Sequence, residues 1–487
     1  MQRARSSGQE LGAGDCICSR SDRDARAAAA PARLRASCAP LSHRKRSVSR
    51  LVEATISQLE VPAEYYQKTT VVADRPPLRP IRRVSTRSSR DLRGVSRVLM
   101  RPTTPSDLLV VQLLLAAQLP GAASCAGPHD CNMAGRCVGQ KCECATGFAG
   151  ASCDTLVMES YHCGQGGLCL ANGSTTWGGS VVRADDGSFH MYAAMMTANR
   201  TMQAWLTNSV VLHAIAPSGH PQGPYTPAGV ALAPRPKPNF DSVMIHCPDV
   251  VRAPDGTFAI FYDGSSTPPG QVVDRAAGAS GLNPIILRQN IGLATATSPF
   301  GPWTRRNTPI LEPSGVNGTW DQLFVTNPAA YIFPNASALL IYKSGRAVGW
   351  PSMYMGVAFA DHYTGPYRRL TPTKPLVIRK QSDDCEDPDI YFDHDYGVLR
   401  MVLHCGCGTQ MLWSATGVDW ELGGPVQASG WCTGFNYTDG TVGRLVTRQR
   451  PHFVLDKGGR ATHLTTGVNR PDDVGMGHTW TMAAKLL

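Results

Sequence analysis

Residues 385–392 read Cys-Glu-Asp-Pro-Asp-Ile-Tyr-Phe, and they are followed by Asp-Tyr-Gly at 395–397 and Leu-Arg-Met-Val-Leu-His at 399–404. Apolar runs on both sides of a tight turn predict a β-hairpin. The first strand begins with an acidic head, and the second strand ends on a polar side chain, His404. This hairpin is the pattern from which the rest of the chain can be interpreted.

The same plan recurs four more times along the chain. The heads of the first strands lie at Ser180, Pro248, Pro328, Pro388 and Pro451, between 60 and 80 residues apart. A third apolar run follows each of the first four hairpins, and three of these runs close on the same kind of turn, at Gly223-Pro224-Tyr225, Gly301-Pro302-Trp303 and Gly365-Pro366-Tyr367. A period of this length made of strands indicates radial blades rather than a solenoid. We therefore predict an all-β fold with a five-bladed β-propeller over residues 160–487.

The basic charge of the chain belongs to one end of it. The formal net charge is +10, and residues 1–99 alone hold 18 Arg and 2 Lys against 9 acidic residues. This segment is rich in Arg, Ser and Ala and poor in aromatic residues, so we expect a disordered leader. A transit peptide or a cytosolic tail is the alternative. Because the remainder is close to neutral, the charge gives no reason to expect binding of nucleic acid.

Residues 100–124 resemble a secretory signal peptide. A basic start at Met100-Arg101 precedes an apolar run at 108–117 and the small residues 121–124. The run is about half of the roughly twenty residues that a membrane span needs. We expect a secreted, extracellular protein. Membrane contact is expected only in the alternative, in which the apolar segment remains uncleaved and anchors an extracellular propeller.

Six cysteines crowd into the next 29 residues, at Cys125, Cys131, Cys137, Cys142, Cys144 and Cys153. A zinc site is the alternative to disulfides, but no histidine lies among the last four cysteines, and a signal peptide implies an oxidising compartment. The Cys-x-Cys followed by Gly147-Phe148 resembles an epidermal-growth-factor-like module over residues 125–153. That resemblance implies the pairs Cys125–Cys137, Cys131–Cys142 and Cys144–Cys153, whereas spacing alone allows fifteen pairings. It also suggests a protein partner for this module.

Seven further cysteines fall within the predicted propeller. Cys163 and Cys169 are spaced for a local loop, Cys405 and Cys407 are too close for an easy mutual bridge, and one thiol should remain unpaired. Five Asn-x-Ser/Thr sequons, which are expected glycosylation sites, begin at Asn172, Asn199, Asn317, Asn335 and Asn436.

In a propeller the heads of the inner strands converge on one funnel, which can gather carboxylates that are far apart in sequence. The head Glu386-Asp387-Pro388-Asp389-Ile390-Tyr391 and the repeat architecture resemble the five-bladed propellers of glycoside hydrolase family 43 over residues 160–487. The resemblance implies that Glu386 is a general acid, which protonates the glycosidic oxygen. It also implies a supporting carboxylate in the second blade, for which Asp249 and Asp263 are the candidates. Turn and strand-entry chemistry is the structural alternative for all three.

The first blade departs from the family pattern. Its head reads Trp177-Gly178-Gly179-Ser180, and Gly178 stands where the resemblance implies an aspartate that acts as general base. Glycine cannot take a proton, and an inverting mechanism needs two carboxyl groups about 6.5–9.5 Å apart. Either another residue supplies the base, or the protein binds glycans without this chemistry.

Other strand heads offer groups for recognising sugar. Trp177 and Trp205 can stack on a sugar ring, and Asn208 and Lys343 can donate hydrogen bonds. The remaining candidates for substrate binding are His246, Asn327, Arg450 and His452. We predict no cofactor and no metal; a metal held by a channel histidine, His404 or His452, is the alternative.

The sequence thus favours a secreted glycosidase-like protein that acts on or binds a polysaccharide or glycoconjugate, with Glu386 as the acid. The alternative is a non-catalytic glycan-binding or adhesion protein that has lost the base at Gly178. A third hypothesis is an extracellular scaffold without a sugar site.

Overall fold

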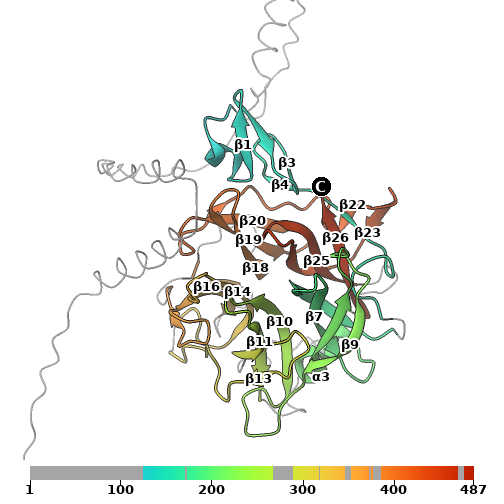
Figure 1. Ribbon diagram of the computed structural model, residues 1–487, viewed down its shortest axis with the longest axis vertical. Coiled ribbons are helices and arrows are strands. Elements are labelled where there is room, and N and C mark those ends of the chain that lie inside the picture. Colours follow the sequence, from blue (N-terminus) through green and yellow to red (C-terminus); the bar gives the residue numbers. More distant parts are fainter. Residues whose placement is uncertain are drawn as a thin grey trace, which may run out of the picture. The chain divides into compact units, whose positions relative to one another are not determined.

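The computed structural model describes residues 124–170, 173–266, 289–316, 319–345, 353–371, 375–376, 385–469 and 477–487, all within one compact unit of the chain. These residues form an all-β structure in which a five-bladed propeller follows a small disulfide-linked module (Figure 1). The predicted leader and all but the last residue of the predicted signal segment lie outside the described residues. No described helix is long and apolar enough to cross a membrane.

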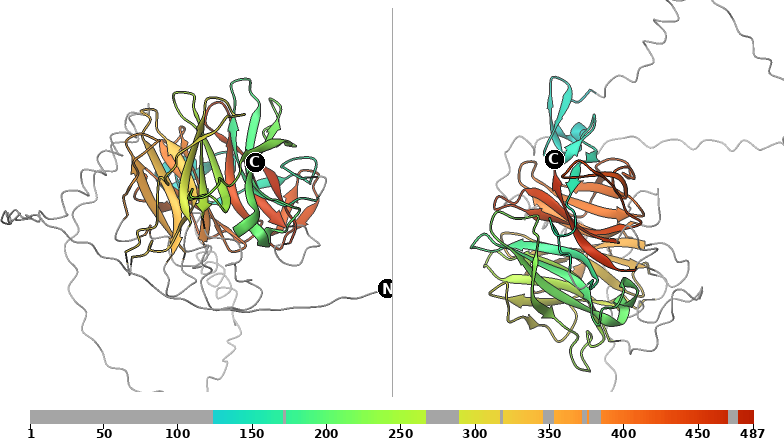
Figure 2. Two further views of the ribbon diagram at one scale, coloured as in Figure 1. Left: turned by 90° about the horizontal axis from the view of Figure 1, so that it is seen from below. Right: turned by 90° about the vertical axis from the view of Figure 1, so that its right-hand side faces the viewer.

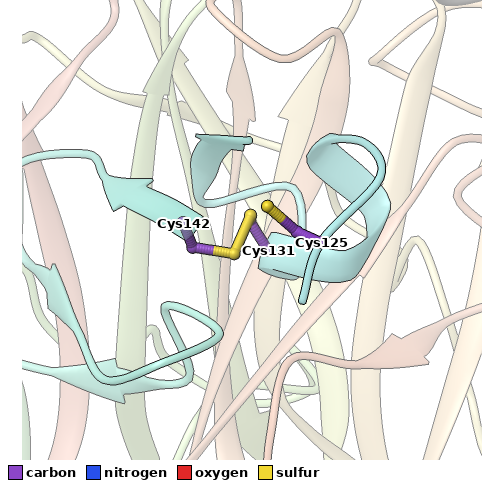
Figure 3. A group of neighbouring side chains, drawn as sticks. All are labelled: Cys125, Cys131 and Cys142. Atoms are coloured by element: carbon purple, nitrogen blue, oxygen red, sulfur yellow. A yellow bond between two sulfur atoms is a disulfide. The ribbon is translucent and has the colours of Figure 1, made fainter. Parts of the chain in front are cut away.

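The small module, which we call the cystine module, comprises residues 125–153. It contains a 3-10 turn η2 (Pro128–Cys131) and the strands β1 (Gly135–Val138), β2 (Lys141–Cys144) and β3 (Phe148–Ala149), the last of which pairs with β4 (Thr155–Leu156). Its disulfides join Cys125 to Cys137, Cys131 to Cys142 and Cys144 to Cys153. These are the pairs that the resemblance implies. Figure 3 shows the Cys131–Cys142 bridge with Cys125 beside it. Cysteines dominate the core, as expected for a module too small for a larger one.

Four of the five blades are four-stranded antiparallel sheets formed by consecutive strands. Blade 1 consists of β6 (Thr176–Arg183), β7 (Phe189–Met196), β8 (Ser209–Ala216) and β9 (Thr226–Leu232). Blade 2 consists of β10 (Met244–Arg252), β11 (Phe258–Ser265), β12 (Asn290–Ala296) and β13 (Thr304–Arg305). Blade 3 consists of β14 (Val325–Ile332), β15 (Ala338–Gly345), β16 (Met353–Ala360) and β17 (Arg368–Arg369), and blade 4 consists of β18 (Cys385–Asp393), β19 (Val398–Cys405), β20 (Thr409–Ser414) and β21 (Glu421–Leu422). The predicted number of blades and the predicted hairpins are thus confirmed.

The fifth blade joins strands from both ends of the propeller. Its sheet has the order β23 (Val442–Arg444), β22 (Thr433–Tyr437), β5 (Met158–Ser160), β26 (Thr479–Leu486), β25 (Ala461–Asn469), β24 (Arg448–Leu455). Strand β5 precedes blade 1 in the chain, yet it pairs antiparallel with β26 and parallel with β22. The ring is therefore closed by hydrogen bonds between strands more than 270 residues apart (Figure 2).

Apolar side chains fill the space between neighbouring sheets. In one cluster, Leu339 and Val357 of blade 3 pack with Met401 of blade 4, and all three are fully buried. Burial of such a side chain contributes about 1.5–3 kcal/mol to folding. Alternating strand residues point to opposite faces, so each sheet supplies one face to the blade on either side.

The cystine module also contacts blade 4 directly. Met133 packs with Tyr396 and Trp413, and its carbonyl accepts a hydrogen bond from Arg400. A cavity of about 740 Å³ lies between the two parts, with Trp413 in its wall.

Three more disulfides, Cys163–Cys169, Cys385–Cys405 and Cys407–Cys432, lie within the propeller. Of the described cysteines, Cys247 is the free one, and it is buried. The side chains of Asn199, Asn335 and Asn436 are exposed, as a glycosylation site requires, whereas Asn172 and Asn317 lie outside the described residues.

The closure by β5 can be tested with two shortened chains. A chain that begins at residue 157 lacks the cystine module but keeps β5, and a chain that begins at residue 162 lacks both. Loss of β5 exposes backbone groups of β22 and β26. We expect the shorter chain to be less stable by roughly 3 kcal/mol, at about 1 kcal/mol for each lost backbone hydrogen bond. Urea unfolding of both chains measures this, and equal midpoints would contradict the role given to β5.

Candidate active site

The inner strand of every blade carries the same irregularity at its head. Register shifts interrupt β6, β10, β14, β18 and β24 at corresponding positions, between the head and the rest of the hairpin. The first residue within each shift has a positive φ near 50–60°: Gly178 (64°), Cys247 (47°), Asn327 (50°), Asp387 (56°) and Arg450 (52°). A bulge re-aims a side chain, and a non-glycine residue in this region costs of order 1–3 kcal/mol. We call these five positions the bulge residues.

The bulges form one ring because the inner strands of successive blades contact one another around the channel, and β24 contacts β6 to complete it. Two residues after each bulge residue lies a second ring, which consists of Ser180, Asp249, Ala329, Asp389 and His452. The two rings place residues from all five blades at the centre of the propeller, as the sequence pattern predicts.

The second ring joins blade 1 to blade 2, blade 2 to blade 3 and blade 4 to blade 5. Asp249 accepts a hydrogen bond from the backbone N–H of Ala330 in blade 3 at 2.8 Å and from Ser180 Oγ in blade 1 at 3.1 Å. Asp389 accepts one from the N–H of Phe453 in blade 5 at 2.8 Å. Its other oxygen lies 3.1 Å from His452 Nδ1. Burial and the nearby Asp389 raise the pKa of Asp249 above its usual range.

Asp263, on β11, joins blade 2 to blade 3 in the same way. Its carboxylate accepts hydrogen bonds from the N–H of Asn327 at 2.9 Å and from Thr326 Oγ1. The side chain is fully buried, and burial raises the pKa of Asp263 to about 6 against the effect of the Thr326 bond. Both predicted supporting carboxylates are therefore also connectors between blades.

Glu386 differs from these carboxylates because its side chain is partly open, with 19% of its surface exposed. It forms an ion pair of 2.5 Å with Lys343 Nζ from β15. His404 Nδ1, from β19, lies 3.8 Å from its other oxygen. The predicted acid thus sits at the channel between Lys343 of blade 3 and His404 of blade 4.

Asp387, the residue after Glu386, is buried and is the one acidic side chain among the five bulge residues. It accepts hydrogen bonds from Asn327 Nδ2 and from the backbone N–H of Arg450 at 3.1 Å. His404 Nδ1 lies 3.5 Å from its Oδ2. Burial disfavours the charged form, but His404 and Arg450 outweigh it and hold the pKa of Asp387 below its usual range. Conversely, Asp387 and Glu386 outweigh burial and raise the pKa of His404.

Arg450 occupies the part of the ring that blade 1 leaves open at Gly178. A Cβ added to Gly178 would lie 2.9 Å from Arg450 Cβ and 3.6 Å from Arg450 Nε. Arg450 Nη1 reaches Asp387 Oδ1 at 3.4 Å. The other terminal nitrogen, Nη2, is buried and has no hydrogen-bond partner among the described residues. An unsatisfied buried donor costs about 1–3 kcal/mol, and more when it is charged.

Five of the predicted sugar-binding residues are buried in this structure: Trp177, His246, Asn327, Arg450 and His452. The other three, Trp205, Asn208 and Lys343, are partly buried. Trp177 packs with Met196 and Met202, so it belongs to the core beside the channel. His246 Nδ1 lies 2.6 Å from Ser209 Oγ, and burial with the nearby Arg450 lowers the pKa of His246 to about 3. Trp205, in the short helix α3 (Trp205–Asn208), is only partly buried and lies over the His246 ring at 5.2 Å between centroids. It is therefore the more accessible of the two tryptophans.

In the channel, two groups of donor atoms are close enough to hold a cation; a third group, Cys125, Cys131 and Cys142, lies in the cystine module, where these cysteines form disulfides. Atoms of Asp249, Asp389 and His452 lie within 4.8 Å of one another, as do atoms of Glu386, Asp387 and His404. In the first group the carboxylates already accept hydrogen bonds from neighbouring blades. In the second group Lys343 and Arg450 supply positive charge. These donor sets are thus neutralised by the protein itself, and the expected absence of a metal stays a prediction.

Sequence reasoning gave Asp387 no role of its own and placed Lys343 and His404 only loosely. Aligning the residue before each head proline would have found Asp387, since Cys247, Asn327 and Arg450 hold the same position in their blades. The signal for Lys343 and His404 is weaker. Both end the second strand of a hairpin, opposite a head residue: Lys343 pairs with Thr326 and His404 with Glu386.

No family model and no curated protein matches the chain. Several solved structures are similar to it. A family 117 glycoside hydrolase produced by the marine bacterium Zobellia galactanivorans aligns with 17% identity and a TM-score of 0.47, covering 68% of this chain and 90% of its own. An α-L-arabinofuranosidase from Podospora anserina, solved with cellotriose, aligns with 12% identity and a TM-score of 0.45 over 68% and 97%. Another from Lactobacillus brevis aligns with 14% identity and a TM-score of 0.43 over 64% and 90%.

The burial of Asp263 predicts a pH-dependent stability. Because its pKa is higher in the folded state than the roughly 3.9 of an unfolded chain, the folded state binds the proton more tightly, and this group lowers stability as pH rises from about 4 to about 6. Asp263→Asn removes that contribution. We expect its stability relative to wild type to improve by about 2–3 kcal/mol across this window. Urea unfolding at pH 4 and pH 7 measures the change, and a pH-independent difference would refute it.

Proposed function

We propose that the channel of the propeller binds a glycan and that Glu386 acts as the acid in hydrolysis of a glycosidic bond. The observation that carries the proposal is the contrast between Glu386 and the carboxylates around it. Asp249, Asp263 and Asp389 accept backbone hydrogen bonds from neighbouring blades. Asp387 accepts one from the backbone N–H of Arg450 and one from the side-chain amide of Asn327. Glu386 accepts no backbone hydrogen bond among the described contacts, and its side chain remains partly exposed.

The chemistry requires a proton at the leaving oxygen. Glu386 would give its proton to the glycosidic oxygen as the bond from that oxygen to the anomeric carbon breaks. A water oxygen would then bond to the anomeric carbon, and the proton lost by the water would pass to a base. Lys343 contacts one oxygen of the Glu386 carboxyl group, and His404 lies 3.8 Å from the other, which leaves that oxygen without a hydrogen bond from the protein among the described contacts.

The proposal leaves the choice of the residue that acts as base to experiment. Gly178 supplies none, and Arg450 fills the adjacent space. Asp249 and Asp263 remain the candidates for a supporting carboxylate, and both have a raised pKa. Either residue would need to exchange an inter-blade hydrogen bond for one to water. This requirement favours a slow hydrolase or a protein that has lost the reaction.

The second candidate function is therefore glycan binding without cleavage. It is favoured by the guanidinium of Arg450, which lies against Gly178, where the base would otherwise lie. Trp205, His246, Asn327, Arg450 and His452 would still contact a sugar. Trp177 would support them from the core.

We further propose that the protein is secreted, with the cystine module as an epidermal-growth-factor-like module that offers a surface to a protein partner. Six disulfides in the described residues suit an oxidising compartment. Three exposed sequons agree with passage through the secretory route. An extracellular propeller anchored by the apolar segment is the alternative.

A glycan screen that measures both bound sugar and released reducing ends tests the function. Wild type is compared with Glu386→Gln and with the control Glu421→Gln, which removes a carboxylate from the outer strand β21 of the same blade. We expect Glu386→Gln to bind glycan while its rate of release falls about 10²–10⁴-fold, the usual contribution of a general acid.

The three hypotheses give different results in this screen. Release by Glu386→Gln at the wild-type rate would show that Glu386 is not the acid. Binding by wild type without release would select the second candidate. If wild type neither binds nor cleaves any of a broad set of glycans, the scaffold hypothesis is the one that remains.

A further inference from the structure

We propose that the glycan carries a negative charge, and that Nη2 of Arg450 receives its carboxylate or sulfate group. This inference rests on the proposed function, because it names the class of sugar that the same channel binds. It concerns recognition and holds whether or not the glycan is cleaved.

The first evidence is the state of the Arg450 side chain. A guanidinium presents its donors in a planar fork that matches the two oxygens of a carboxylate or the oxygens of a sulfate. Nη1 and the backbone N–H of Arg450 contact Asp387. Nη2 has no acceptor among the described residues, although only 2% of Arg450 is exposed. One side of the fork is thus held in place, and the other side is left for a ligand.

The second evidence is the composition of the ring around this donor. Gly178 has no side chain, and Asn327 is uncharged. Burial raises the pKa of the Cys247 thiol well above its usual range, so this side chain is neutral as well. Asp387 is the one anion among the bulge residues, and Asn327 and Arg450 both donate to it. No carboxylate of the bulge residues is therefore free to pair with Nη2.

The third evidence is the charge at the partly open rim. Lys343 lies there beside Glu386, and 13% of its side chain is exposed. His404 adds a group whose pKa is raised by Asp387 and Glu386. Facing them are Glu386, Asp387, Asp263 and, in the second ring, Asp249 and Asp389 with His452. Because Lys343 pairs with Glu386 and Arg450 Nη1 pairs with Asp387, the attraction for an anionic sugar comes from the donor that this pairing leaves over, Nη2 of Arg450.

Arg450 also holds a costly backbone conformation. It is one of four non-glycine bulge residues with a positive φ. Strain of this kind persists where the surrounding structure fixes it, and such residues cluster at binding sites. Here the backbone sets where the side chain starts, and the contact of Nη1 with Asp387 positions the guanidinium before any ligand arrives, which reduces the ordering cost of binding.

The test compares pairs of glycans that differ only in charge. Oligogalacturonides of two to six units are measured against their methyl esters, and carrageenan oligosaccharides against their desulfated forms, by calorimetry with the full chain. We expect the charged member of at least one pair to bind about tenfold tighter or more, because a hydrogen bond between two charged groups is stronger than one to a neutral group. The preferred pair identifies carboxylate or sulfate.

Variants then assign the preference to Arg450. Arg450→Gln should bind the charged and the neutral member of the preferred pair equally, and Arg450→Lys should recover part of the preference because it keeps the charge but not the fork. Arg460→Gln, which removes an exposed arginine from an ion pair with Asp395, is the matched control and should keep the wild-type preference.

Each way in which the proposal can fail gives a different experimental result. Equal binding of charged and neutral glycans by wild type overturns the anionic sugar but leaves the proposed glycan function intact. A preference that survives in Arg450→Gln overturns the role of Arg450. No binding of any glycan, charged or neutral, overturns the proposed function itself. If Arg450→Gln does not unfold cooperatively on heating, this variant is not properly folded and its binding is not used. The comparison of charged and neutral glycans with the wild-type protein then decides whether the bound sugar is anionic.

Discussion

The structure depends on the hydrogen bonds that buried carboxylates make from one blade to the next. Asp249 bonds to blades 1 and 3, Asp263 to blade 3, and Asp389 to blade 5. The bulges interrupt the regular pairing of the inner strands, so backbone N–H groups at the channel need other acceptors. A carboxylate from the neighbouring blade supplies two acceptor oxygens at that point. The same contact satisfies the backbone and sets the position of one blade against the next.

This constraint explains why the channel is rich in acidic residues without each of them being available for chemistry. A carboxylate that holds two blades together is buried, and burial raises its pKa, as it does for Asp249 and Asp263. Asp387 shows the opposite outcome, because Arg450 and His404 stabilise its charge. Glu386 is left as the partly exposed carboxylate of this group. Whether a carboxylate connects two blades or can face a ligand thus depends on how many backbone N–H groups donate hydrogen bonds to it.

Ring closure is the second requirement of the fold. Without β5, the fifth blade would present unpaired edges at β22 and β26, and open edges promote aggregation. The cystine module precedes β5 in the chain and packs on blade 4 through Met133. Gln427 holds the segment that connects the module to β5. Its side-chain oxygen accepts a hydrogen bond from the N–H of Leu156, and its side-chain nitrogen donates one to the carbonyl of Leu156. The module is thereby attached next to the closing strand.

The sequence by itself determined the all-β class, the five hairpins with their heads and the positions of the cysteines, because these features depend on local periodicity, turn chemistry and spacing. It also determined that Gly178 cannot be a base. Through the family resemblance it gave Glu386 the role of the acid, but it could not choose between Asp249 and Asp263 for the supporting carboxylate, since both are acidic residues of the same blade at a strand head or a strand end. Only the tertiary structure decided which carboxylates bond to a neighbouring blade, that Trp177 lies in the core, and that Arg450 packs against Gly178. The physical reason is that burial, hydrogen-bond partners and the charge around a group are properties of residues 60 to 300 positions apart in the chain, which no local pattern records.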